Sequence, residues 1–182
     1  MTIAPLGREA TLEDLYAVDG KAELVDGRLI VMSPAGDAHA TAARNIVVHL
    51  TLHEWAHGGG RAYPDGVGFI ASPRRTFSPD AAWFTGPRSG DRLLSGAPAL
   101  AVEVRSPEDY GLAGERRLAA KRADYFAAGS LVVWDVDVLR EGWIRVHRAD
   151  DPEHPVVFRR GETADAEPAV PGWRFPVDEL FR

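Results

Sequence analysis

One short segment, Ala99 to Val104 with the sequence ALAVEV, constrains the fold more than any other part of the chain. Five of its six residues are apolar, which is typical of a strand buried in the middle of a sheet. The exception is Glu103. A carboxylate that is buried without a partner costs several kcal/mol, so Glu103 must face a cation, a metal ion or an edge of the sheet. The segment therefore predicts a central strand with a polar site beside it.

The rest of the chain alternates short apolar runs with segments of helical pattern. We expect long helices from His39 to His57, which ends at three glycines, and from Gly114 to Ala128, which Gly129 closes. Residues 11–18 and 176–181 are expected to form short helices, and Asp26-Gly27 within 22–32 predicts a β-hairpin. The expected strands cover residues 66–71, 80–84, 99–104, 131–136, 143–147 and 156–159.

This order of elements predicts an α/β protein, in which an N-terminal β-hairpin precedes a central mixed sheet with helices on its faces. The length of 182 residues suits one domain over 1–182, and no linker separates two parts. No run of 18 apolar residues and no signal-like N-terminus occurs, so we expect no membrane span and a cytoplasmic location. Because cysteine is absent, oxygen and imidazole groups would have to hold any metal ion.

The net charge of -6 argues against broad, non-specific binding of nucleic acid, because phosphate affinity comes mainly from clustered basic residues. Local charge can differ from the total. Two basic groups stand out along the chain: Arg74, Arg75, Arg88 and Arg92, and then Arg116, Arg117, Lys121 and Arg122. Either group could be ordinary solvated surface or a surface that faces phosphate, and the pattern leaves both interpretations open.

Two carboxylates and one lysine are the main candidates for chemistry. Asp80 follows Pro79 at the start of one short strand, and Glu103 lies within the next. If these strands are neighbours, both carboxylates could hold one Mg²⁺ or Mn²⁺ ion. Lys121 is one of two lysines, against nineteen arginines, and borders the helix stripe expected to face the sheet. Its alternatives are a lysine that reaches to solvent, and Arg122 at the other edge of the stripe.

Taken in order, the motifs resemble the Uma-two family of restriction endonuclease-like proteins, a bacterial branch of the PD-(D/E)xK nuclease superfamily. The resemblance rests on Pro79-Asp80, Glu103-Val104-Arg105-Ser106-Pro107, Lys121-x-x-x-Tyr125-x-x-x-Gly129, Val133-Trp134-Asp135-Val136-Asp137, Glu23 to Gly27, His39, and the closing Pro171 to Phe181. It spans nearly the whole chain and implies the restriction endonuclease-like fold.

The resemblance makes Asp80 and Glu103 the metal ligands, for Mg²⁺ or Mn²⁺, and Lys121 the active-site lysine, displaced from the sheet to the helix. Arg105 occupies the place where the superfamily usually has its lysine. An arginine cannot act as a base because it does not lose its proton in proteins, so a contact with phosphate is its candidate role.

Glu23 and His39 are possible further ligands or proton carriers, and a hairpin surface residue and a helix-start histidine are their alternatives. The family leads us to expect an acidic residue near the start of the lysine helix, where this chain has Arg116 and Arg117.

The function implied by the resemblance is that of a metal-dependent endonuclease that hydrolyses phosphodiester bonds in DNA and works as a homodimer. The candidate nucleic-acid-binding residues are Arg74, Arg75, Arg116, Arg117 and Arg122. One alternative, favoured by the acidic net charge, is a non-catalytic nucleic-acid-binding or regulatory protein that keeps the fold. Another is an interaction domain with no nucleic-acid role.

A zinc site is a competing interpretation of three histidines. His49, His53 and His57 recur every four residues, and imidazoles at this spacing can share a zinc ion. No glutamate follows His49 in the H-E-x-x-H manner, and a solvated or partly packed helix face explains the spacing more simply.

Overall fold

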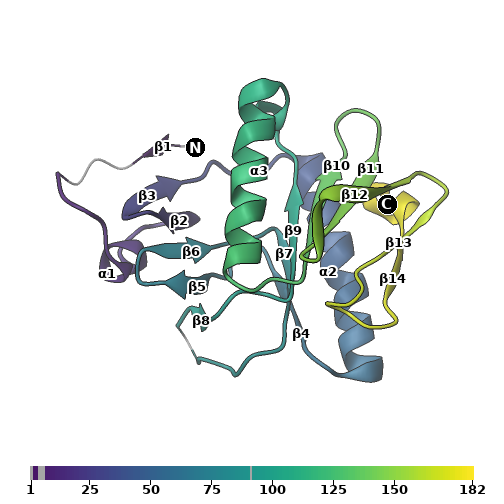
Figure 1. The fold of residues 1–182 in the computed structure, drawn as a ribbon, viewed down its shortest axis with the longest axis horizontal. Coiled ribbons are helices and arrows are strands. Elements are labelled where there is room, and N and C mark those ends of the chain that lie inside the picture. The colour runs from purple at the N-terminus through teal and green to yellow at the C-terminus, as the bar shows by residue number, and fades with distance from the viewer. Residues whose placement is uncertain (1, 4–6, 91) are drawn as a thin grey trace.

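The computed structural model describes residues 2–3, 7–90 and 92–182 (Figure 1). The helices are α1 (Leu12–Tyr16), α2 (Asp37–His57) and α3 (Leu112–Ala127), with the 3-10 helices η1 (Pro107–Asp109) and η2 (Val177–Phe181). The strands are β1 (Thr2–Ile3), β2 (Ala22–Val25), β3 (Arg28–Val31), β4 (Arg61–Pro64), β5 (Phe69–Ser72), β6 (Arg75–Phe77), β7 (Ala81–Phe84), β8 (Leu94–Ser95), β9 (Leu100–Val104), β10 (Val132–Asp137), β11 (Trp143–Arg148), β12 (Asp151–Arg159), β13 (Thr163–Asp165) and β14 (Arg174–Pro176).

The central sheet has the strand order β12-β11-β10-β9-β7-β4. The apolar run of the sequence is β9, which lies inside this sheet, parallel to β10 and antiparallel to β7. Four of its five residues are buried, and Glu103 is the partly exposed one. The predicted mixed sheet and its central strand are therefore confirmed.

The two long helices cover opposite faces of this sheet, because successive side chains of a strand point to opposite sides. Leu100 and Val102 of β9 belong to the same core cluster as Ile46 of α2. Ala101 belongs to a different cluster, with Tyr125 of α3. Glu103 shares the side of Ala101, so the predicted polar site lies on the α3 side of the sheet.

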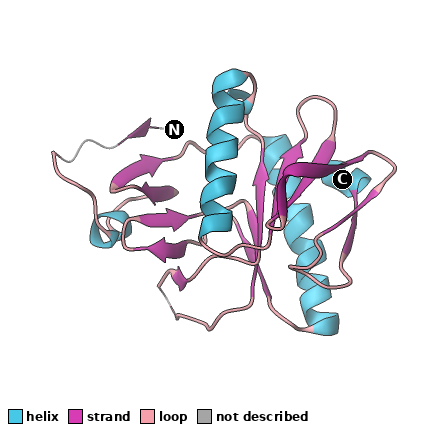
Figure 2. Ribbon diagram, in the orientation of Figure 1, coloured by secondary structure: helices cyan, strands magenta, loops and turns pink. Residues whose placement is uncertain are grey.

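The N-terminal hairpin is confirmed, and it is part of a larger structure than the sequence predicted. Asp26 and Gly27 have φ angles of 50° and 73°, as a type I′ turn requires. The hairpin strands β2 and β3 belong to a second six-stranded sheet, β1-β3-β2-β6-β5-β8, which Figures 1 and 2 show beside α3. This sheet was not predicted, because strands such as Arg75–Phe77 are too short and too polar to show a pattern.

The C-terminal segment also differs in detail from the prediction. The short strands β13 and β14 pair with each other, and the closing helix is the 3-10 helix η2. Trp173, in the segment just before β14, stacks on Trp134 of the central sheet with ring centroids 5.1 Å apart. Within the described parts of the chain, no helix is both long enough and apolar enough to cross a membrane.

Candidate active site

A pocket of about 580 Å³ opens on the α3 side of the central sheet. We call it the carboxylate pocket, after the charged side chains of its wall. These include Lys21, Glu23, His39, Asp65, Asp80, Glu103 and Lys121. The pocket thus brings together residues from both sheets, from α2 and from α3, although they are far apart in the sequence.

Asp80 lies directly before β7 and is only 4% exposed. Its Oδ2 accepts a hydrogen bond of 2.8 Å from the backbone N–H of Val104, and its Oδ1 accepts one of 2.9 Å from Lys21. His39 Nε2 lies 3.2 Å from Oδ2. Burial by itself would raise the pKa of Asp80, but His39 and Lys21 hold this pKa well below its usual range. Asp80 is therefore an ionised carboxylate.

His39 stands at the start of α2 and is mostly buried. Burial lowers the pKa of its imidazole, but the Asp80 carboxylate outweighs this effect and raises the pKa above the usual value. Neither ring nitrogen of His39 has a hydrogen bond of good geometry to another described residue. Buried polar atoms usually have partners, so His39 has unused capacity to bind a ligand or carry a proton at this pocket.

Glu103 is held by two side chains of α3. Lys121 Nζ donates to Glu103 Oε2 at 2.9 Å, and the Tyr125 hydroxyl donates to Oε1 at 2.6 Å. Burial raises the pKa of Glu103 to about 7, with repulsion from Asp80 and Glu23 adding to the effect and Lys121 opposing it. Glu103 therefore has a partner, as its place in an apolar run requires.

Lys121 lies between two carboxylates, because its Nζ is also 3.0 Å from Glu23 Oε1. Burial lowers the pKa of Lys121, but the Glu103 and Glu23 carboxylates outweigh it and raise the pKa above the usual value. The lysine is therefore firmly protonated. Glu23 is 5% exposed and accepts a 2.7 Å hydrogen bond from the backbone N–H of Ser78, so its position is not that of a hairpin surface residue.

Three members of this arrangement were missed by sequence reasoning: Lys21, Asp65 and Tyr125. Lys21 Nζ lies 2.6 Å from Asp65 Oδ1 in addition to its contact with Asp80. Lysine is scarce in this chain, and both of its lysines are at the carboxylate pocket. This scarcity was a signal that applied to Lys21 as much as to Lys121. Asp65 lies in a turn and had no comparable signal.

The donor atoms of the pocket suit a hard divalent cation, because they are carboxylate oxygens with an imidazole beside them. The imidazole of His39, whose Nδ1 has no hydrogen bond to another described residue, fits the same interpretation. Among the described residues, no three His, Asp or Glu side chains stand together in a metal-binding arrangement. A lysine ammonium stands between the carboxylates instead: Lys21 lies between Asp65 and Asp80, and Lys121 lies between Glu23 and Glu103.

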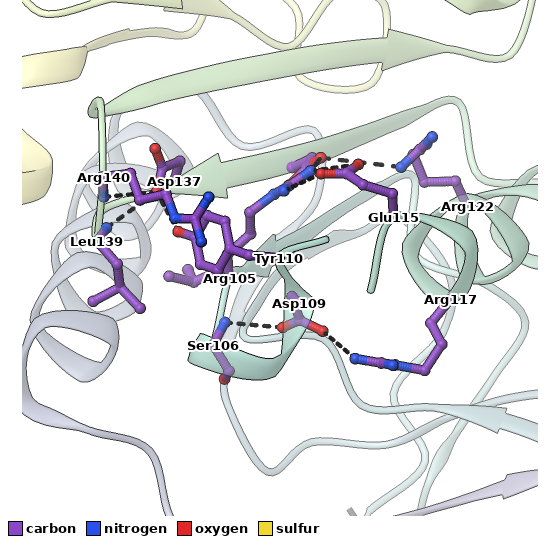
Figure 3. Close-up of polar contacts among 12 residues, drawn as sticks. Arg105, Ser106, Asp109, Tyr110, Glu115, Arg117, Arg122, Asp137, Leu139 and Arg140 are labelled. Carbon is purple, nitrogen blue, oxygen red and sulfur yellow. Dashed lines mark hydrogen bonds and ion pairs between the residues drawn. The ribbon is translucent and has the colours of Figure 1, made fainter. Parts of the chain in front are cut away.

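Arg105 is not at the carboxylate pocket, which corrects its candidate role as a phosphate contact. Its side chain is 2% exposed and donates to both carboxylate oxygens of Asp135 at 2.7 Å. It also donates to Glu115 of α3 at 2.5 and 3.0 Å (Figure 3). Glu115 is an acidic residue in the first turn of α3, directly before Arg116 and Arg117, so the apparent departure from the family pattern is corrected.

The other arginine candidates are distributed differently. Arg117 lines the carboxylate pocket and lies 3.5 Å from Asp109 in η1 (Figure 3). Arg74 pairs with Glu9, and Arg122 lies 4.0 Å from Asp135 on the Arg105 side. The remaining two candidates, Arg75 and Arg116, do not line the carboxylate pocket.

His49, His53 and His57 of α2 do not form a metal site in the described structure. His53 and His57 stack on each other with ring centroids 4.5 Å apart, and His49 packs edge-on against Phe175. The packed helix face is therefore the interpretation that the structure favours.

The fold is that of a known class of nuclease-like α/β proteins. A solved structure from Anabaena variabilis ATCC 29413, described as "a putative nuclease belonging to DUF820", matches with a TM-score of 0.73 and 16% sequence identity. The match covers 94% of this chain and 97% of that one. Residues 10–178 match the family model Uma2, whose description is "Putative restriction endonuclease". The chain belongs to the Uma2 family, which confirms the resemblance, and comparison with curated proteins finds no match.

Proposed function

We propose that this chain is a divalent-metal-dependent endonuclease that hydrolyses phosphodiester bonds in DNA, with residues 1–182 acting as one domain. The main support is that Asp80, Glu103 and Lys121, which come from three different elements, line one pocket. Membership of the Uma2 family and the shared fold agree with this proposal.

The proposed ligands of Mg²⁺ or Mn²⁺ are Asp80 and Glu103. When bound, the ion would lower the pKa of a water molecule, polarise the scissile phosphate and neutralise charge on its oxygens. Tyr125 orients the Glu103 carboxylate through its 2.6 Å hydrogen bond, and the Val104 N–H orients Asp80. The positions of both carboxylates are thus fixed by the chain itself.

Lys121 acts as a cation in this proposal. Because Glu103 and Glu23 keep it protonated, it binds a phosphate oxygen and stabilises negative charge, and it does not remove a proton from water. His39 is the candidate proton carrier, because it lines the pocket and its Nε2 lies 3.2 Å from Asp80 Oδ2. Lys21, the residue directly before β2, is a second cation, and its Nζ lies 2.9 Å from Asp80 Oδ1.

A non-catalytic nucleic-acid-binding or regulatory protein is the second candidate. It is favoured by the net charge of -6 and by the ion pairs that neutralise both lysines. Such a protein would keep the pocket without turning over a substrate.

The test is cleavage of plasmid and single-stranded DNA in Mg²⁺ or Mn²⁺. We expect Asp80→Asn and Lys121→Met to lower the rate about 100-fold or more, because each removes charge stabilisation at the reacting phosphate. Asp150→Asn, which changes an exposed carboxylate at the β11–β12 turn, is the matched control and should cleave like the wild type. Equal rates in all four proteins would refute the catalytic proposal and indicate a contaminant.

A homodimer is part of the proposal by analogy with enzymes that cut both strands of a duplex. Sedimentation of the purified protein at several concentrations tests it, and a monomer at every concentration would contradict it.

A further inference from the structure

A second recess, of about 320 Å³, adjoins the carboxylate pocket. We call it the α3 recess, because it lies between α3 and the strands β2, β3 and β6 of the N-terminal sheet. Glu23, Arg117 and Lys121 line both cavities. A ligand that places a phosphate beside Lys121 would therefore have its neighbouring group at the entrance of the recess.

The walls of the α3 recess differ in character from those of the carboxylate pocket. Val25, Ile30, Phe77 and Ala120 give it apolar sides, and the ion pair of Arg75 with Asp124 provides polar atoms at the rim. Apolar walls with a few polar groups are typical of sites for flat heterocycles. The cations that line the recess, Arg75, Arg117 and Lys121, each lie beside a carboxylate. The recess is thus better suited to a nucleobase than to a second phosphate.

Phe77, which lines the recess, is connected to Glu103 of the carboxylate pocket through Tyr125. Phe77 stacks on Tyr125 with ring centroids 4.2 Å apart, and Tyr125 donates its 2.6 Å hydrogen bond to Glu103. A base that rests against Phe77 is therefore held at a fixed place relative to the Glu103 carboxylate. Such a contact would position the substrate as well as bind it.

The size of the recess limits what can enter. Pockets for small ligands usually measure about 300 to 1,000 Å³, so this one is at the lower limit and fits a single base. A base inside a duplex must leave its stack and its partner before it can enter such a cavity. An unpaired nucleotide has no partner to lose.

The charge of the chain also favours an unpaired, single-stranded substrate over a duplex. Duplex binding depends mainly on phosphate contacts from lysine and arginine, but the chain has a net charge of -6 and its two lysines are paired with carboxylates. Contacts with bases must then supply a larger part of the affinity, as in proteins that bind single strands.

We propose that the α3 recess binds the nucleobase next to the scissile phosphate, and that the preferred substrate is an unpaired, single-stranded segment of nucleic acid. This inference rests on the proposed nuclease function and specifies its substrate. Ala120 is the key position, because it is exposed on α3 and lines the recess.

The test is fluorescence anisotropy of the full chain with a labelled DNA single strand and with the same strand in a duplex, both in EDTA so that no cleavage occurs. We expect the wild type to bind the single strand about tenfold more tightly than the duplex. Ala120→Phe fills the recess and should weaken single-strand binding about tenfold, which is within the range of base-stacking contributions. It should leave duplex binding unchanged.

Ala119→Phe is the matched control, because Ala119 is exposed on the same helix and lines neither cavity. It should bind like the wild type. Ile30→Ala, which removes one wall of the recess without adding bulk, should weaken single-strand binding severalfold. Circular dichroism checks that each variant is folded.

Equal affinity of the wild type for the two DNA forms would overturn the proposal, as would equal binding by the Ala120→Phe and Ala119→Phe variants. The cleavage assay tests the proposed nuclease function independently of these binding measurements. Selective loss of single-strand binding in Ala120→Phe supports the recess even if the wild type cleaves nothing. If cleavage depends on Asp80 but Ala120→Phe shows no selective loss of single-strand binding, the nuclease function is supported and the role of the α3 recess is refuted.

Discussion

The guanidinium of Arg105 and the carboxylate of Asp135 are joined by two hydrogen bonds, both 2.7 Å long, in the interior of the protein. The same guanidinium binds Glu115 in the first turn of α3. Arg105 follows Glu103 by two residues, and Glu115 precedes Lys121 by six on the same helix. This network therefore connects the strand that carries Glu103 to the helix that carries Lys121.

Replacement of Arg105 by methionine should strongly destabilise the fold, because Asp135 would be left buried without its cation. Removing one partner of a buried ion pair costs about 3–5 kcal/mol, and we expect a loss of this order in the free energy of unfolding. Urea denaturation followed by circular dichroism measures it. Arg159→Met is the control, because the pair of Arg159 with Glu141 is exposed and contributes about 1 kcal/mol or less. A similar loss in the two variants would contradict this role for Arg105.

The sequence predicted the centre of the fold because burial leaves a clear pattern there. An apolar run identifies β9, and a carboxylate within that run had to have a partner, which proved to be Lys121 with Tyr125. The helix phase of Lys121 was informative for the same reason. The assignment of catalytic roles to these residues stays a prediction, because geometry alone does not measure turnover.

The parts that could not be predicted depend on contacts between distant segments. Nothing in the sequence around Lys21 or Asp65 shows that they meet, since a loop and a turn have no periodicity. The second sheet joins the predicted hairpin to strands such as β6 and β8, which are too short to show alternation. The direction of Arg105 was ambiguous as well: a basic residue near a candidate site can face a ligand or a buried acid, and only the presence of Asp135 on the neighbouring strand decides between them.

Removal of the Lys21 ammonium should strengthen binding of a divalent cation. Lys21 neutralises Asp80, so a metal ion that binds Asp80 must compete with it. We expect Lys21→Met to bind Mn²⁺ about tenfold more tightly in isothermal titration calorimetry, and to gain more thermal stability than the wild type when Mn²⁺ is added.

Arg28→Met is a suitable control for Lys21→Met, since it removes one positive charge from an exposed strand position outside the carboxylate pocket. Its affinity for Mn²⁺ should match that of the wild type. Weaker Mn²⁺ binding by Lys21→Met would show that the lysine assists the cation and does not compete with it.

The raised pKa of Glu103 predicts a specific pH dependence of stability. A carboxyl group whose pKa is higher in the folded protein than in the unfolded chain contributes stability that is full at low pH. That contribution is lost as the pH rises from the ordinary value of 4.5 to about 7. Asp80 behaves in the opposite way, and its contribution is lost only as the pH falls below about 4, outside this window.

Glu103→Gln should therefore gain stability relative to the wild type between pH 4.5 and 7, by up to about 3 kcal/mol. Urea denaturation of both proteins at several pH values gives the difference in the free energy of unfolding. Glu153→Gln, at an exposed position of β12, controls for the loss of one negative charge. A difference between Glu103→Gln and wild type that does not change with pH would exclude this titration.

Gly114 allows the start of α3 to lie directly against η1, the segment that follows β9. A Cβ atom at this position would be 2.3 Å from the backbone carbonyl of Asp109, which is far closer than any normal contact. Alanine in a helix is usually more stable than glycine by about 1 kcal/mol. Here we expect the opposite sign, with Gly114→Ala losing about 1–3 kcal/mol because backbone must move.

Thermal and urea denaturation of Gly114→Ala measure this loss, with Ala113→Gly at the preceding exposed position as a reference for helix propensity alone. The displacement should also reach the carboxylate pocket, because Asp109 and Arg117 both line it and their side chains are 3.5 Å apart. Metal binding should then weaken in Gly114→Ala but not in Ala113→Gly. A stabilised Gly114→Ala protein with unchanged Mn²⁺ affinity would mean that η1 can shift freely, and that its contact with α3 does not set the shape of the pocket.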